Sequence, residues 1–194
     1  MRKNLVEDFH LAHSTRAGIP GLRNVDHIAC TVPDLGLAIT FFRRVIGCEL
    51  VYRAGPLFDP EGDWMTRHVG VHARAELELA MLRCGPTMNL ELLEWSGGAP
   101  ADALPAHSDA AGHHLAFYVT DMAAAVDHLA AIPGVHVLGR PTMMTGSLDE
   151  GEWFVFFRAP WGMLLELVSR PAWMPYEAIT SHRLFGPAPS WAAR

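Results

Sequence analysis

Two segments of this 194-residue chain repeat the same pattern, and this internal duplication constrains the fold more than any other feature. The stretch "HIACTVPDLGLAITFFRRVIGCELV" from His27 aligns without gaps with "HLAFYVTDMAAAVDHLAAIPGVHVL" from His114. A second stretch, "RCGPTMNLELLEW" from Arg83, aligns with "RAPWGMLLELVSR" from Arg158 and places Glu91 over Glu166. The chain is therefore predicted to contain two copies of one supersecondary unit.

Each copy has the pattern of a β-α-β-β-β module. A short strand (residues 25–32 or 114–120) precedes an aspartate that can cap a helix, Asp34 or Asp121. An apolar stripe at helical spacing follows and is expected to end at Gly47 or Gly134, and three strands come next. The fold class is α+β, with two tandem βαβββ modules. The predicted division is an N-terminal extension (1–21), a first module (22–95), a linker (96–111), a second module (112–170) and a C-terminal arm (171–194).

Composition excludes several classes of protein. Half of the residues are hydrophobic and the net charge is −6, which supports a packed core and argues against nucleic-acid binding. No segment approaches the roughly 18 apolar residues of a membrane span, and no secretory signal is recognisable at the start. We therefore expect a cytoplasmic protein whose three cysteines, Cys30, Cys48 and Cys84, are reduced thiols.

The duplicated strands carry two histidines and two glutamates, namely His27, Glu91, His114 and Glu166. Because side chains alternate along a strand, His113 is expected to face away from His114. Both glutamates lie within apolar strands, where an unpaired carboxylate is costly and normally pairs or binds a metal. Two imidazoles and two carboxylates suit one divalent ion of Zn, Ni, Co, Mn or Fe. The alternative is a duplication that retained polar residues for packing.

With these motifs, the sequence resembles the vicinal oxygen chelate superfamily, the glyoxalase/bleomycin resistance protein/dioxygenase group. The resemblance covers roughly residues 22–170 and rests on "VDHIACTVPDLGLAITFFRRVIGCEL", "NLELLEW", "GHHLAFYVTDM" and "APWGMLLELVS". It implies an incomplete eight-stranded barrel around one metal ion, with His27, Glu91, His114 and Glu166 as ligands. In such proteins the modules pair within one chain or exchange between the two chains of a homodimer.

The resemblance also implies a class of reaction. A four-ligand set with glutamate at position 91 is similar to those of glyoxalase I and methylmalonyl-CoA epimerase. We therefore expect a metal-dependent isomerase, epimerase or lyase, acting on a small molecule with vicinal oxygens through a metal-bound enolate. Glu166 is the first candidate for the base, with Glu91 and Glu78 as further candidates for proton transfer. The alternatives are an Fe(II) extradiol-type dioxygenase, with Glu91 as an outer residue, and a non-catalytic antibiotic-binding protein.

Overall fold

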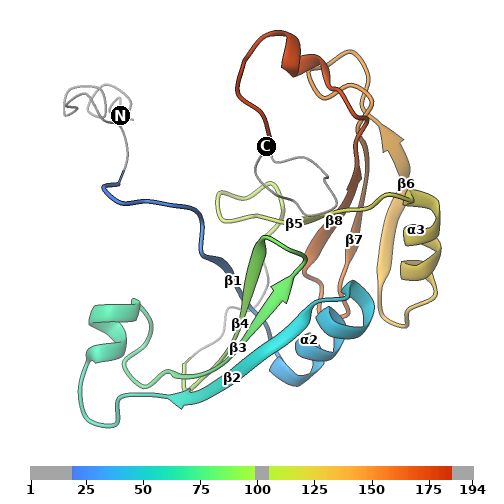
Figure 1. The fold of residues 1–194 in the computed structure, drawn as a ribbon. Helices are drawn as coiled ribbons and strands as arrows, with labels where there is room; N and C mark the ends of the chain where they lie inside the picture. Colours follow the sequence, from blue (N-terminus) through green and yellow to red (C-terminus); the bar gives the residue numbers. More distant parts are fainter. Residues whose placement is uncertain (1–18, 99–104, 185–194) are drawn as a thin grey trace.

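The computed structural model describes residues 19–98 and 105–184, which form two modules with the same order of elements (Figure 1). The first contains β1 (His27–Thr31), α2 (Leu35–Phe41), β2 (Glu49–Leu57), β3 (Glu76–Cys84) and β4 (Met88–Ser96). The second contains β5 (Leu115–Tyr118), α3 (Met122–Ala130), β6 (His136–Met143), β7 (Trp153–Arg158) and β8 (Leu164–Ser169). The predicted α+β fold of two βαβββ units is confirmed. Residues 1–18 of the expected extension, 99–104 of the linker and 185–194 of the arm lie outside the described residues.

Each module forms a four-stranded sheet, and the two sheets have equivalent strand orders, β1-β4-β3-β2 and β5-β8-β7-β6. The first strand of each module runs parallel to the last, and the other pairings are antiparallel. Ala29 lies opposite Glu91, and its duplicate Ala116 lies opposite Glu166. The internal repeat therefore extends to the hydrogen-bonding register.

Both helices begin at the predicted caps but end differently. Asp34 accepts a hydrogen bond from the Leu37 amide at 2.7 Å, and Asp121 accepts one from Ala124 at 2.9 Å. The first helix continues through a π-helical turn, η1 (Phe42–Ile46), to the left-handed Gly47. The second helix ends at Ala130, earlier than the predicted Gly134. The reason is Pro133, which has no N–H to extend the helix and disfavours helical backbone at the preceding residue.

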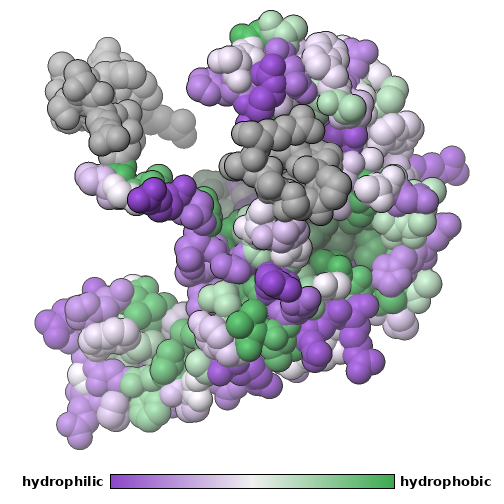
Figure 2. All heavy atoms as spheres, in the orientation of Figure 1, coloured by the Kyte–Doolittle hydropathy of each residue, from purple (hydrophilic) through white to green (hydrophobic). Residues whose placement is uncertain are grey.

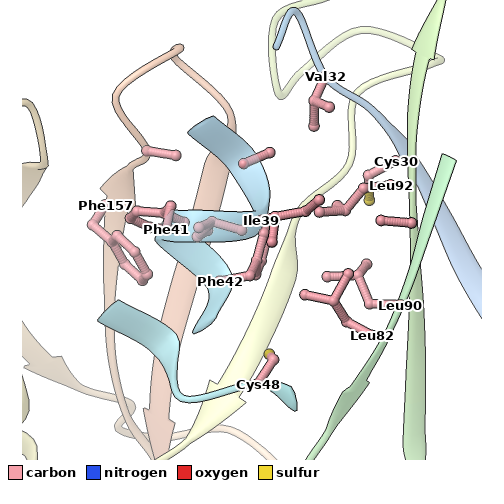
Figure 3. Close-up of a cluster of buried hydrophobic side chains, with 14 of the residues drawn as sticks. Cys30, Val32, Ile39, Phe41, Phe42, Cys48, Leu82, Leu90, Leu92 and Phe157 are labelled. Atoms are coloured by element: carbon pink, nitrogen blue, oxygen red, sulfur yellow. The ribbon is translucent and has the colours of Figure 1, made fainter. Parts of the chain in front are cut away.

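One hydrophobic core joins the two modules (Figure 3). Its largest fully buried side chains come from both sheets and from the first helical segment: Leu35, Phe42, Leu82, Leu90, Leu92, Val155, Phe157 and Leu165. The Phe41 ring packs edge-on against Trp161 of the second module, with the centroids 5.2 Å apart. Because strand side chains alternate, this core occupies one face of each sheet, and the opposite faces point away from it.

Cys48 and Cys84 form a disulfide between the start of β2 and the end of β3, so the expectation of reduced thiols is wrong for this pair. The antiparallel register places Glu49 opposite Arg83, which brings the flanking cysteines together. That register cannot be read across a separation of 36 residues. Cys30 is free and buried, and burial raises its pKa to about 11.

Replacing both Cys48 and Cys84 with alanine is expected to lower the free energy of unfolding by about 2–4 kcal/mol, because the closed loop restricts the unfolded chain. Urea unfolding followed by circular dichroism measures the loss. Wild-type protein unfolded in the presence of a strong reductant should show a similar decrease in the free energy of unfolding, relative to the oxidised protein. Equal stability of the double variant and the oxidised wild-type protein would contradict the prediction.

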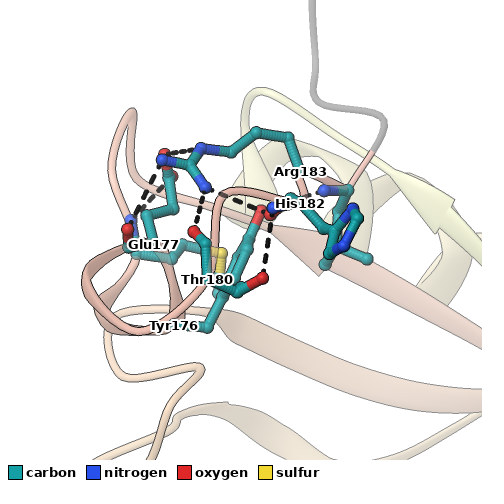
Figure 4. Close-up of polar contacts among 7 residues, drawn as sticks. Tyr176, Glu177, Thr180, His182 and Arg183 are labelled. Atoms are coloured by element: carbon teal, nitrogen blue, oxygen red, sulfur yellow. Dashed lines mark hydrogen bonds and ion pairs between the residues drawn. The ribbon is translucent and has the colours of Figure 1, made fainter.

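The described part of the C-terminal arm folds back onto the loop that precedes β7. The amide of Tyr176, in the 3-10 turn η3 (Pro175–Ala178), donates to the Leu148 carbonyl at 3.0 Å. Arg183 forms an ion pair with Glu177 at 2.9 Å and also donates to the Thr180 carbonyl (Figure 4). None of the described helices is long and apolar enough to cross a membrane.

Candidate functional site

The first candidate pair joins His27 on β1 to Glu91 on β4. Nε2 of His27 lies 3.3 Å from Oε2 of Glu91, and Nδ1 lies 2.8 Å from Oδ2 of Asp26. The Asp26 hydrogen bond is the main reason that the pKa of His27 is raised; Glu91 adds to the effect and burial opposes it. A carboxylate can only accept, so the closer contact with Asp26 is a hydrogen bond when Nδ1 carries the hydrogen, and in a neutral ring this leaves the Nε2 lone pair free. This is the tautomer that a metal ligand requires.

The second pair joins His114, directly before β5, to Glu166 on β8. Nε2 of His114 lies 3.0 Å from Oε2 of Glu166, whose side chain is 12% exposed. Burial raises the pKa of Glu166, the nearby Glu152 carboxylate raises it further, and His114 partly opposes the shift. Nδ1 of His113 instead lies 3.2 Å from the Ala111 carbonyl oxygen. Of the two adjacent histidines, His114 is therefore the one that contacts the glutamate.

The four predicted ligands form two separate pairs in one chain. Both pairs lie on the sheet faces that point away from the shared core, because their strand neighbours Cys30, Leu92 and Leu165 fill that core. Within residues 19–98 and 105–184, no three His, Cys, Asp or Glu side chains are grouped to hold a metal ion. A cavity of 560 Å³ between the modules is bordered by His114 but by none of the other three. Among the described residues, a single chain therefore keeps the two pairs apart.

The structure does not bring Glu78 together with either pair. Glu91 lies opposite Met81 on β3, whereas Glu78 lies opposite Glu94, three positions along the strand. Since side chains alternate, Glu78 projects from the other face of this sheet. Its carboxylate forms an exposed ion pair with Arg53 at 3.3 Å.

Two residues next to the pairs were not identified from the sequence. Asp26 contacts Nδ1 of His27, and His107 contacts Nδ1 of His114 at 2.9 Å. Asp26 could have been found in the sequence, because it directly precedes His27. The repeat gave no support, because its duplicate is His113, whose ring does not contact His114. His107 lies in the linker, outside the repeat, where no sequence pattern connects it to His114.

The chemistry of each pair fits half of a metal site. Among the ion pairs of the described residues, Glu91 and Glu166 contact histidine rather than lysine or arginine. A neutral imidazole and a carboxylate both offer lone pairs, so the pair can bind a divalent cation. Two such pairs provide two nitrogen and two oxygen donors, and their carboxylates balance the charge of the ion.

Comparison with known proteins identifies the class of enzyme. A 2-epi-5-epi-valiolone epimerase from Actinomyces sp. is 48% identical over 178 residues, which cover 92% of this chain and 96% of the relative. This similarity identifies the chain as an enzyme of the isomerase class.

Solved structures show the same fold. A glyoxalase family protein from Bacillus cereus superposes with a TM-score of 0.60 at 22% identity and covers 79% of this chain and 99% of that protein. A glyoxylase/bleomycin resistance protein/dioxygenase domain from Frankia sp. gives 0.56 at 19% identity and covers 78% and 94%. The family model of the Glyoxalase/Bleomycin resistance protein/Dioxygenase superfamily matches residues 26–149. The chain therefore belongs to this superfamily, the vicinal oxygen chelate proteins.

Proposed function

We propose that this enzyme inverts a stereocentre next to the carbonyl of a valiolone-type cyclic ketone. The observation that carries the proposal is the 48% identity, over almost the whole of both chains, to a 2-epi-5-epi-valiolone epimerase. The substrate name denotes a ketone, and a hydrogen on the carbon beside a ketone can leave as a proton because the resulting charge spreads onto the oxygen. Epimerisation by proton removal and return is therefore the simplest chemistry for such a substrate.

The proposed site uses both His–Glu pairs. His27, Glu91, His114 and Glu166 would hold one divalent ion, which supplies Lewis-acid stabilisation of the negative charge on the substrate oxygen. Each imidazole has a partner on Nδ1, at 2.8 Å and 2.9 Å, and this second contact fixes the direction of Nε2. The rings are thus oriented before any ion arrives.

Glu166 is the proposed base. Burial and the nearby Glu152 carboxylate raise its pKa in the metal-free site, so it would accept the proton while detached from the ion. Inversion also needs a proton donor on the opposite side of the carbon, and we assign this role to Glu91 of the other pair, which must be protonated when it donates. Glu78 has no role in this proposal, because its side chain projects from the other face of the sheet.

We further propose that two copies of the chain complete the site, with the first module of one facing the second module of the other. The separation of the two pairs in one chain supports this arrangement. So does a run of exposed large apolar side chains along β2 and the π-helical turn η2 (Met65–Val69), a region at the lower left of Figure 2 where hydrophobic and hydrophilic residues are mixed. The run consists of Val51, Tyr52, Leu57, Phe58, Trp64 and Val69. A two-fold axis would cover both copies of this surface and form two identical sites.

Incubation with a valiolone-type ketone in D2O tests the proposed reaction. We expect inversion of one stereocentre together with uptake of one deuterium at the carbon beside the carbonyl. A chelator should abolish both effects, and a divalent ion should restore them. Inversion without deuterium uptake would exclude proton transfer with solvent. Oxygen consumption with catechols would instead support the dioxygenase, and binding without turnover would support a ligand-binding protein.

A further inference from the structure

We propose that His107, from the linker between the modules, is a positioning residue that fixes the orientation and tautomer of His114. The inference rests on the proposed metal site, and it concerns a residue that lies outside the duplicated motifs. Its basis is a direct contact, in which Nε2 of His107 lies 2.9 Å from Nδ1 of His114. When Nε2 of His114 binds a metal ion, Nδ1 carries the hydrogen and donates it to His107.

Comparison of the two His–Glu pairs shows that His107 takes the role that Asp26 has in the first module. In the first module the preceding residue, Asp26, accepts from Nδ1 of His27. The duplicate of Asp26 is His113, whose ring lies beside the Ala111 carbonyl and not beside His114. In the second module no described residue of the repeat contacts Nδ1 of His114 in the way that Asp26 contacts Nδ1 of His27. The linker supplies His107 instead, at a similar distance.

The contact is reinforced by an aromatic side chain. The rings of His107 and His114 both pack against Phe156, with centroid distances of 5.3 Å and 5.2 Å. Phe156 lies directly opposite Glu166 in the β7–β8 pairing. Phe156 thus limits the rotation of both imidazoles on the sheet face that carries the carboxylate.

The linker is folded in a way that delivers His107 to this place. Asp109 accepts a side-chain hydrogen bond from the Ala106 amide at 2.7 Å, and its own amide donates to the Ala106 carbonyl at 2.9 Å. Gly112 closes the turn by donating to the Asp109 carbonyl at 2.8 Å. A Cβ at position 112 would lie only 2.2 Å from the Ala106 carbonyl oxygen and 2.6 Å from that of His107. Only glycine permits this close approach of the backbone. The position of His107 therefore depends on the turn that Gly112 closes.

The test compares the affinity of Co²⁺ for the metal-free protein and its variants, by competition with a chromophoric chelator. His107→Leu removes the acceptor and is expected to weaken binding by about 10–100-fold, the usual effect of losing such a partner. His107→Gln places an amide oxygen near the position of Nε2 and should restore most of the affinity. His113→Leu is the matched control, since it removes a neighbouring histidine that faces away, and it should bind as the wild-type protein does.

A second measurement separates positioning from general destabilisation. In long-range ¹H–¹⁵N spectra of the metal-free protein, at a pH where its imidazoles are neutral, His114 should carry its hydrogen on Nδ1 in the wild-type protein and in His107→Gln. The Zn²⁺-loaded protein gives the reference spectrum of that tautomer. Unchanged affinity and an unchanged His114 spectrum in His107→Leu would overturn this inference alone. A wild-type protein that binds neither ion would overturn the proposed function, and the role of His107 with it. His107 is exposed, so the variants are expected to fold, which thermal unfolding verifies.

Discussion

Glu166→Gln is expected to lower kcat by about 10²–10⁴-fold, which is the usual contribution of a positioned acid or base. Glutamine has nearly the same shape as glutamate, but its amide cannot accept a proton from carbon. The loss should appear in kcat, measured with a valiolone-type ketone at saturation. It should also appear in the rate of deuterium uptake, because the same group removes the proton.

The matched control for this prediction is Glu49→Gln, which alters an exposed glutamate paired with Arg83 on the first sheet. It should retain kcat within about twofold, as expected for a surface substitution remote from the site. Thermal unfolding should show that both variants remain folded. A Glu166→Gln enzyme with more than about a tenth of the wild-type kcat would exclude Glu166 as the base, given the size of the effect expected.

Mixing two inactive variants is expected to restore activity if the site forms between chains. One variant carries His27→Ala and Glu91→Ala, and the other carries His114→Ala and Glu166→Ala. Alone, each should be almost inactive, because every site lacks one pair. After joint unfolding and refolding, a mixed dimer contains one intact site and one site that lacks both pairs. With random pairing, activity should reach about one quarter of the wild-type value.

The same mixture also tests the alternative, in which the two modules of one chain form the site together. If the modules paired within one chain, every site would contain a damaged half and mixing would restore nothing. Wild-type protein taken through the same refolding gives the reference value, and light scattering after gel filtration establishes the size of each sample. Full recovery of the wild-type reference with no recovery in the mixture would contradict the proposed exchange of modules.

The repeat made much of the structure predictable. Strand alternation and the two aligned blocks were enough to place His27 beside Glu91, to choose His114 over His113 and to identify both helix caps. Each of these features depends on residues close in the sequence or on the strand register that both modules share. The sequence could not reveal the Cys48–Cys84 bond, because the register of β2 against β3 depends on how a long intervening loop folds.

The arrangement of the modules was also beyond prediction. An alternating strand specifies that it has a buried face, but it does not say which other module covers that face. The separation of the two pairs follows from packing between α2 and the second module, where Phe41 meets Trp161. His107 was missed for a related reason, since its partner is set by a linker turn that has no counterpart in the repeat.

The shared aromatic packing also bears on the origin of the chain. A half-length ancestor that ended after β4 would have had neither Trp161 nor Phe157 to cover Phe41 and Phe42. Leaving two phenylalanine rings in water costs several kcal/mol, a large part of the stability of so small a domain. Such an ancestor would have needed a second copy of itself as a cover, and in the present chain the second module takes that place.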